Sequence, residues 1–113
     1  MTARGRLRWR RDFAAVRAEG VKVRRPSVTL YVRHRSPDHG PARLGLAVAT
    51  RCGSAVTRNR IKRRLRAAFE RSTGQGAMDV VAHARAATAE VPFQELVDAF
   101  DAALEATPQG ASR

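Results

Sequence analysis

Apolar side chains recur along much of the chain with the spacing of two that is typical of strands. Residues 28–34 alternate strictly between apolar and polar positions, and residues 43–49 alternate between large apolar and small side chains. This alternation predicts two half-buried strands, joined by the turn-rich residues 36–41. Residues 79–84 are mostly apolar, which predicts a further, buried strand.

Three other segments have the spacing of three or four residues that predicts amphipathic helices. The first helix is expected over residues 12–19, with Gly20 at its end. The strongest signal runs from residue 54 or 57 to residue 71. The last helix is expected to begin at Pro92 and to stop before Pro108.

The long helix lies between the strands predicted at residues 43–49 and 79–84. A strand that is reached through a helical crossover is usually parallel to its partner. We therefore predict an α/β sandwich in which the apolar stripe of the long helix docks on the sheet.

The opposite face of this sheet is suited to a ligand. Gly45, Ala47 and Ala49 are small and leave room above it, and Tyr31 and Arg33 lie beside them on the neighbouring strand. The pattern predicts a shallow groove.

Length and composition restrict the class of protein. The chain has 113 residues, of which 43% are hydrophobic, enough for one domain with one core. Its longest apolar run, residues 44–49, is too short to span a bilayer, and no secretory signal follows the basic N-terminus. The lone Cys52 fits a reducing compartment and offers no zinc ligand set, so we expect a cytoplasmic protein.

Charge adds a partner to this picture. The formal net charge is +12, with +16 on residues 1–71 and −4 on residues 72–113. Such an excess indicates a polyanion, and nucleic acid fits better than an anionic membrane because no bulky apolar helix face accompanies the basic residues.

The long helix concentrates this charge. Seven basic residues and one acidic residue lie within residues 58–71. A solvated helix face is the ordinary meaning of a charge run, but like charges one turn apart repel, so the unbalanced run favours a phosphate-binding surface. At 100° per residue, the side chains opposite the apolar stripe are Asn59, Lys62, Arg63 and Arg66, and those flanking it are Arg58, Arg60 and Arg64.

Rings and guanidiniums come together at two predicted elements. Tyr31 with Arg33, and Phe13 with Arg17, combine stacking surfaces with cations, which is typical of proteins that bind single-stranded nucleic acid. Phe13 is equally consistent with an anchor in the core, and Trp9 offers another ring near the basic terminus.

Catalytic groups are sparse. His34, Asp38 and His39 lie in or beside one loop, where ordinary surface residues are the better interpretation than a metal site. His83 alternates with apolar residues and is interpreted as a satisfied histidine of the sheet, and Cys52, Ser54 and Ser72 lack the neighbours of a nucleophile. We expect a binding protein without catalytic residues of its own.

Residues 58–66 (Arg-Asn-Arg-Ile-Lys-Arg-Arg-Leu-Arg), after residues 44–48 and 53–56, closely resemble the signature of the bacterial ribonuclease P protein subunit. The resemblance extends over nearly the whole chain. It implies the order α-β-β-β-α-β-α, an α+β two-layer sandwich with a left-handed βαβ crossover. It also implies one domain over residues 1–113, with an ordered core at about residues 7–105 and flexible ends.

In this family a catalytic RNA removes the 5′ leader from precursor tRNA with Mg²⁺, and the protein binds both RNAs. The resemblance implies a monomeric protein that contacts the catalytic RNA through Arg51, Arg58, Asn59, Arg60, Lys62, Arg63 and Arg66, and the leader through Phe13, Arg17, Tyr31 and Arg33. It assigns the catalysis to the RNA and no organic cofactor to the chain.

Two positions depart from the family pattern. Arg17 stands where many relatives carry a second aromatic residue, so one stacking surface is replaced by a charge. Residues 50–52 keep one cation, Arg51, where many relatives have two. A structural RNA-binding protein of a ribosomal type is the alternative that charge supports, and a self-sufficient nuclease is disfavoured by the lack of a carboxylate cluster.

Overall fold

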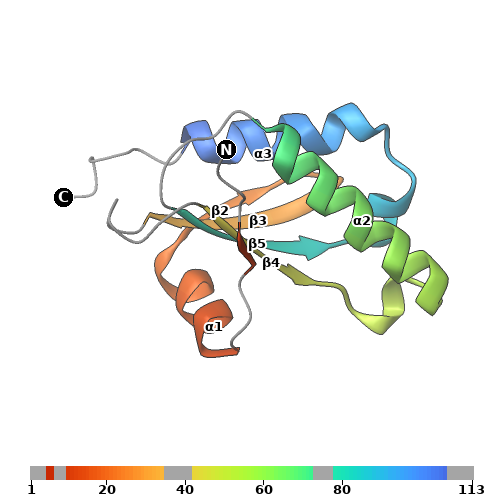
Figure 1. Ribbon diagram of the computed structural model, residues 1–113, viewed down its shortest axis with the longest axis horizontal. Helices are drawn as coiled ribbons and strands as arrows, with labels where there is room; N and C mark the ends of the chain where they lie inside the picture. Colours follow the sequence, from red (N-terminus) through yellow and green to blue (C-terminus); the bar gives the residue numbers. More distant parts are fainter. Residues whose placement is uncertain (1–4, 7–9, 35–41, 73–77, 107–113) are drawn as a thin grey trace.

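The computed structural model describes residues 5–6, 10–34, 42–72 and 78–106 (Figure 1). Its elements are β1 (Gly5–Arg6), α1 (Arg10–Glu19), β2 (Val21–Arg24), β3 (Val28–His34), β4 (Arg43–Ala47), α2 (Ala55–Arg71), β5 (Met78–Ala84) and α3 (Phe93–Ala106), with 3₁₀ turns at Thr50–Cys52 and Ala86–Ala89. The expectations for Trp9, the loop 36–41 with Asp38 and His39, Pro108 and flexible ends lie outside the described residues.

The strands form one mixed sheet in the order β1-β4-β5-β3-β2. β4 and β5 are parallel, as the crossover through α2 predicted, whereas β5, β3 and β2 pair antiparallel. α2 and α3 cover one face of this sheet, and α1 lies against the other (Figure 1). The predicted α+β sandwich is confirmed, with one helix added on its second face.

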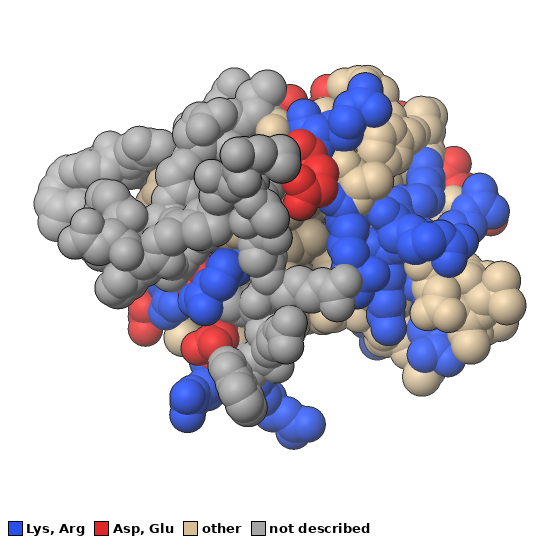
Figure 2. Space-filling model, in the orientation of Figure 1, with Lys and Arg blue, Asp and Glu red and all other residues tan. Residues whose placement is uncertain are grey.

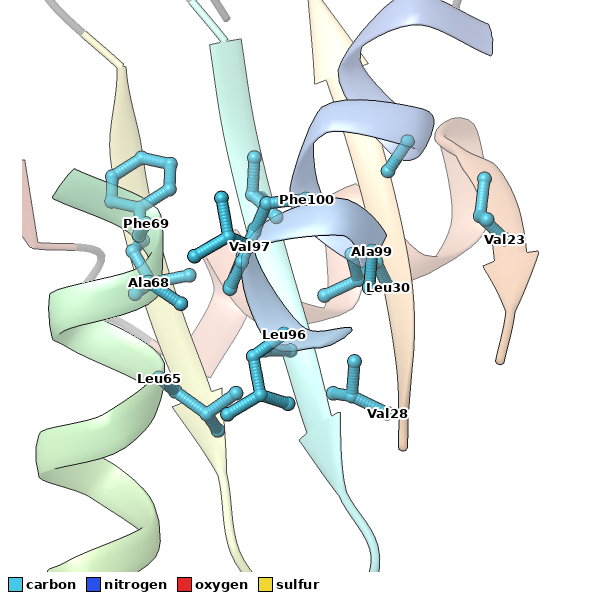
Figure 3. Close-up of a cluster of buried hydrophobic side chains, with 14 of the residues drawn as sticks. Val23, Val28, Leu30, Leu65, Ala68, Phe69, Leu96, Val97, Ala99 and Phe100 are labelled. Carbon is cyan, nitrogen blue, oxygen red and sulfur yellow. The ribbon is translucent and has the colours of Figure 1, made fainter. Parts of the chain in front are cut away.

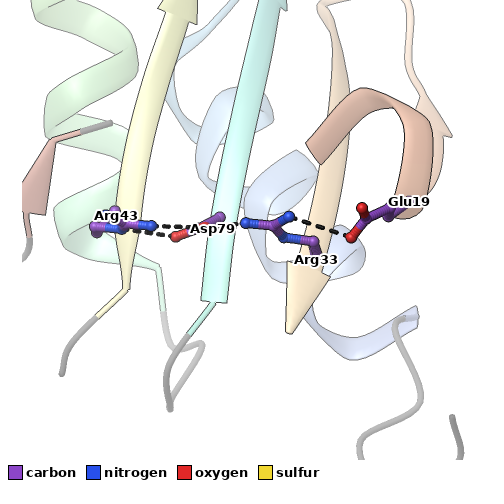
Figure 4. Close-up of polar contacts among 4 residues, drawn as sticks. All are labelled: Glu19, Arg33, Arg43 and Asp79. Carbon is purple, nitrogen blue, oxygen red and sulfur yellow. Dashed lines mark hydrogen bonds and ion pairs between the residues drawn. The ribbon is translucent and has the colours of Figure 1, made fainter. Parts of the chain in front are cut away.

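The crossover from β4 to β5 has an uncommon hand. Figures 3 and 4 view the sheet from opposite faces, and in both β5 lies beside β4 with the two strands pointing the same way. Seen from the side of α2 with both strands running upward, β5 lies to the left of β4. The crossover is therefore left-handed, as the family resemblance implied and against the general right-handed preference.

α2 begins where its sequence provides a cap. The Ser54 side chain accepts a hydrogen bond from the backbone N–H of Thr57 at 3.2 Å, which settles the open choice between residues 54 and 57. Gly53 precedes the cap at φ 143°, a conformation that favours glycine. Ile61, Leu65, Ala68 and Phe69 are buried against the sheet, so the rest of the helix faces outward, and Figure 2 shows Lys and Arg side chains gathered there.

The main core lies between the sheet and the pair α2 and α3 (Figure 3). Val28, Leu30 and Val32 of β3 are buried under this layer, as their alternation predicted. The rings of Phe69 and Phe100 meet at 5.6 Å between centroids and join the two helices. Of the stripe predicted for α3, Leu96, Val97, Phe100 and Leu104 are buried, whereas Phe93 is half-buried beneath the Arg71 guanidinium.

Candidate nucleic-acid interface

The outward face of α2 carries the candidate RNA-binding side chains. Asn59, Arg60 and Arg63 are exposed, and Arg58, Lys62 and Arg66 are half-buried. We call these six side chains the α2 basic surface. Within the described residues, no carboxylate lies within ion-pair distance of them. Their charge is therefore available to a ligand.

One arginine of the same helix has a different role. Arg64 donates to the backbone carbonyl of Thr88 at 2.6 Å and to that of Val91. It ties α2 to the segment that leads into α3. The sequence placed Arg64 only at the flank of the apolar stripe, and the structure makes it a fold residue.

The strand register arranges the candidate cleft residues in rows across the face of the sheet that α1 partly covers. The first row is Arg33, Asp79 and Arg43; the second is Tyr31, Val81 and Gly45; the third is Thr29, His83 and Ala47. Each row has different chemistry.

The first row is an ion-pair network (Figure 4). The fully buried carboxylate of Asp79 accepts from Arg33 at 3.0 Å and from Arg43 at 2.9 Å, and Arg33 also contacts Glu19 of α1 at 3.2 Å. Burial opposes the charge of Arg33, but its bonds to Asp79 and Glu19 prevail and raise its pKa; the bond to Asp79 raises the pKa of Arg43. Arg33, expected to contact a ligand, has its guanidinium engaged by two carboxylates.

The second row holds a ring where open space was expected. A Cβ atom on Gly45 would come within 2.6 Å of Cζ of Phe13, so the small residue makes room for this ring. Phe13 and Tyr31 are half-buried and pack against the buried pair Val16 and Val81. The expectation of an empty groove above Gly45 is therefore wrong: Phe13 fills that space.

Beyond Tyr31 the surface does open into a groove of about 210 Å³. We call it the cationic groove; it is lined by Lys22, Arg24, Thr29, Tyr31, Arg51, His83, Ala84 and Arg85. Lys22 lies 5.8 Å from the centroid of the Tyr31 ring, and Arg85 donates to the Thr29 hydroxyl at 3.1 Å. Four cations and one aromatic ring thus line a space that receives no carboxylate from the described residues.

His83 lies at the centre of the third row. Its Nε2 is 3.1 Å from Nη1 of Arg17, and its ring meets that of Tyr31 edge-on at 5.5 Å between centroids. Burial, and then the charges of Arg17 and Lys22, lower the pKa of His83 below its ordinary value. The imidazole is therefore neutral at pH 7.

The structure brings together some predicted residues and adds others. Arg17 and Tyr31 meet through His83, and Arg51 lies in the groove as well as next to the start of α2. Sequence reasoning missed Lys22, Arg24, His83 and Arg85 as groove residues. The alternation of Val21, Lys22, Val23 and Arg24 was the available signal, but it covers only four residues.

Other chemistry is not apparent in the part of the chain that the structure describes. It contains no group of three or more His, Cys, Asp and Glu side chains that could hold a metal ion. It also contains no helix of the length and apolarity that a bilayer crossing requires.

Comparisons with known proteins converge on one family. The family model described as Ribonuclease P matches residues 1–107. The ribonuclease P protein component of Pseudarthrobacter chlorophenolicus is 38% identical over 110 residues, covering 95% of this chain and 79% of that protein. That of Shouchella clausii is 40% identical over 95 residues, covering 80% and 75%.

Solved structures agree with the sequence comparisons. The RNase P protein from Thermotoga maritima has a TM-score of 0.75 at 28% identity, covering 93% of this chain and 99% of that one. The Staphylococcus aureus RNase P protein has a TM-score of 0.74 at 24% identity, covering 92% and 95%, and shows the same fold.

Proposed function

Because the chain belongs to the ribonuclease P protein family, and is thus a subunit of the endoribonuclease that matures the tRNA 5′ end, we propose that it holds two RNA segments at once. The catalytic RNA lies on the α2 basic surface. The 5′ leader of precursor tRNA lies in the cationic groove, on the opposite face of the sheet from the helical core.

The α2 basic surface suits a folded RNA. Its five cations and one amide project from a helix whose other face is buried, so the charges are held at fixed spacing. Fixed cations displace condensed counterions from an RNA backbone, and this release favours binding. Arg51 lies between this surface and the groove, where it can contact either RNA.

The observation that carries the leader assignment is the aromatic ring of Tyr31 within a groove lined by four cations. Bases of single-stranded RNA stack on such rings while the cations follow the phosphates. Phe13 supports this site from beneath, through its contacts with Tyr31 and Gly45. Arg33 contributes by holding α1 and the sheet together rather than by touching RNA.

We propose that the Mg²⁺ of the enzyme is held mainly by the RNA, which carries out the cleavage. The one buried carboxylate in the described part of the chain, Asp79, is already shared by two arginines. The lone, buried Cys52 fits a cytoplasmic protein, and the chain acts as a monomer within the complex.

Multiple-turnover cleavage of a precursor tRNA tests the proposal. The cognate catalytic RNA at low Mg²⁺ is assayed with the protein, without it, and against the protein by itself. Cleavage that is stimulated only in the mixture supports the assignment. Tight binding to unrelated structured RNAs, with no effect on cleavage, would instead support the ribosomal type of RNA-binding protein, which the family match does not favour.

Tyr31→Ala is expected to weaken binding of leader-bearing precursor tRNA by about 1 to 3 kcal/mol, because a base loses its stacking surface. Mature tRNA, which has no leader, should bind the reconstituted enzyme as before. Tyr31→Phe keeps the ring and serves as the matched control. Equal losses for precursor and mature tRNA, or a loss as large with Tyr31→Phe, would remove stacking on Tyr31 from the account.

A further inference from the structure

The contact between Arg17 and His83 joins α1 to the sheet at the rim of the cationic groove. We propose that His83 is a positioning residue for the leader: it holds the guanidinium of Arg17 where that group binds a leader phosphate, next to the base that stacks on Tyr31. The inference rests on the proposed function of the groove.

The polarity of the contact defines the state of His83. A guanidinium can only donate hydrogen bonds, so Nη1 of Arg17 donates and Nε2 of His83 accepts at 3.1 Å. The ring therefore carries its proton on Nδ1. The neutral form that this bond needs is also the form favoured by burial and by the nearby charges of Arg17 and Lys22.

The surroundings of His83 offer donors rather than acceptors. Lys22 and Arg24 line the groove from β2, Arg51 from the turn after β4, and Arg85 from the end of β5. The nearest carboxylate on its own strand, Asp79, is bound by Arg33 and Arg43. A ligand that fits this set must be rich in acceptor oxygens, which is the character of a phosphodiester.

Arg17 needs such a support because it is exposed on the last turn of α1. A free arginine side chain has many rotamers, and fixing it on binding costs conformational entropy. The bond to His83 uses one N–H of the guanidinium and leaves the others for phosphate oxygens. Contact with the Tyr31 ring at 5.5 Å fixes the imidazole in turn, so charge and stacking surface are held as one unit.

A double-mutant cycle in the reconstituted enzyme tests this role. Single-turnover cleavage gives the apparent affinity for precursor tRNA, and competition by mature tRNA gives the affinity without a leader. Arg17→Ala should reduce the preference for the leader about tenfold, the value of a charge-assisted contact. His83→Leu should reduce it about threefold to fivefold, because Arg17 remains but is no longer held.

Two comparisons separate positioning from a merely structural effect. His83→Gln can still accept from Arg17 and should restore the preference to within about twofold of the original. In the Arg17→Ala background, His83→Leu should have no further effect. The proposal is overturned if glutamine does no better than leucine, or if the two losses multiply.

Tyr31→Ala in the same assay distinguishes failure of this inference from failure of the proposed function. If Tyr31→Ala lowers the leader preference and the His83 variants do not, only the positioning role is wrong. If none of the variants changes it, the groove is not the leader site.

Discussion

Asp79→Asn is expected to lower the free energy of unfolding by about 3 kcal/mol. The Asp79 side chain is fully buried, and its two oxygens receive three contacts of 2.9 to 3.0 Å from Arg33 and Arg43. A neutral amide leaves these two guanidiniums facing each other across β5 without the charge that separates them (Figure 4). Chemical denaturation in urea measures the loss.

Two variants control for the charge change. Arg43→Gln should cost less than Asp79→Asn, because Asp79 keeps Arg33 and the Arg43 side chain is already 34% exposed. Glu90→Gln removes one exposed carboxylate and should change stability by no more than about 0.5 kcal/mol. If Asp79→Asn proves no more harmful than either control, the network is not a main determinant of stability.

The sequence predicted those elements whose signal is long and one-sided. β3 has the predicted bounds, residues 28–34, because strict alternation over seven residues specifies one buried face. α2 ends at the predicted residue 71 for the same reason, since its apolar stripe extends over several turns.

Short elements escaped prediction. β2 has four residues, two of them cations, so its pattern is indistinguishable from a polar loop. β4 ends at Ala47 rather than at residue 49, because the chain turns into the 3₁₀ turn Thr50–Cys52 before the alternation of side chains stops. Local pattern does not report where pairing with a neighbouring strand ceases.

The candidate site shows the same division. The outward side chains of α2 follow from helical geometry, since Asn59, Arg60 and Arg63 are exposed as their angular positions require. Partners of Arg33, Arg64 and His83 lie 46, 24 and 66 residues away along the chain, respectively. Only the folded register brings such pairs together, so the sequence could not tell a ligand-binding arginine from one engaged in the fold.

This distinction matters most on α2, where the largest effect on RNA binding is expected from Arg60→Glu combined with Arg66→Glu. Neither side chain has a carboxylate partner within the described residues, so both are available to phosphates. Affinity depends on salt concentration with a slope of about 0.9 per phosphate contact, so two lost contacts lower the slope by nearly 2. At about 0.1 M salt this corresponds to a loss of about 60-fold in affinity for the catalytic RNA.

Arg25→Glu is the matched control, because it makes the same change of charge at an exposed residue outside both α2 and the groove. It should lower the affinity slightly through the net charge and leave the slope nearly unchanged. Arg64→Glu should instead destabilise the fold, since two backbone carbonyls lose their donor. If the α2 double variant behaves like Arg25→Glu, the charge on α2 does not contact the RNA, and the binding surface must be sought around Arg51 and the groove.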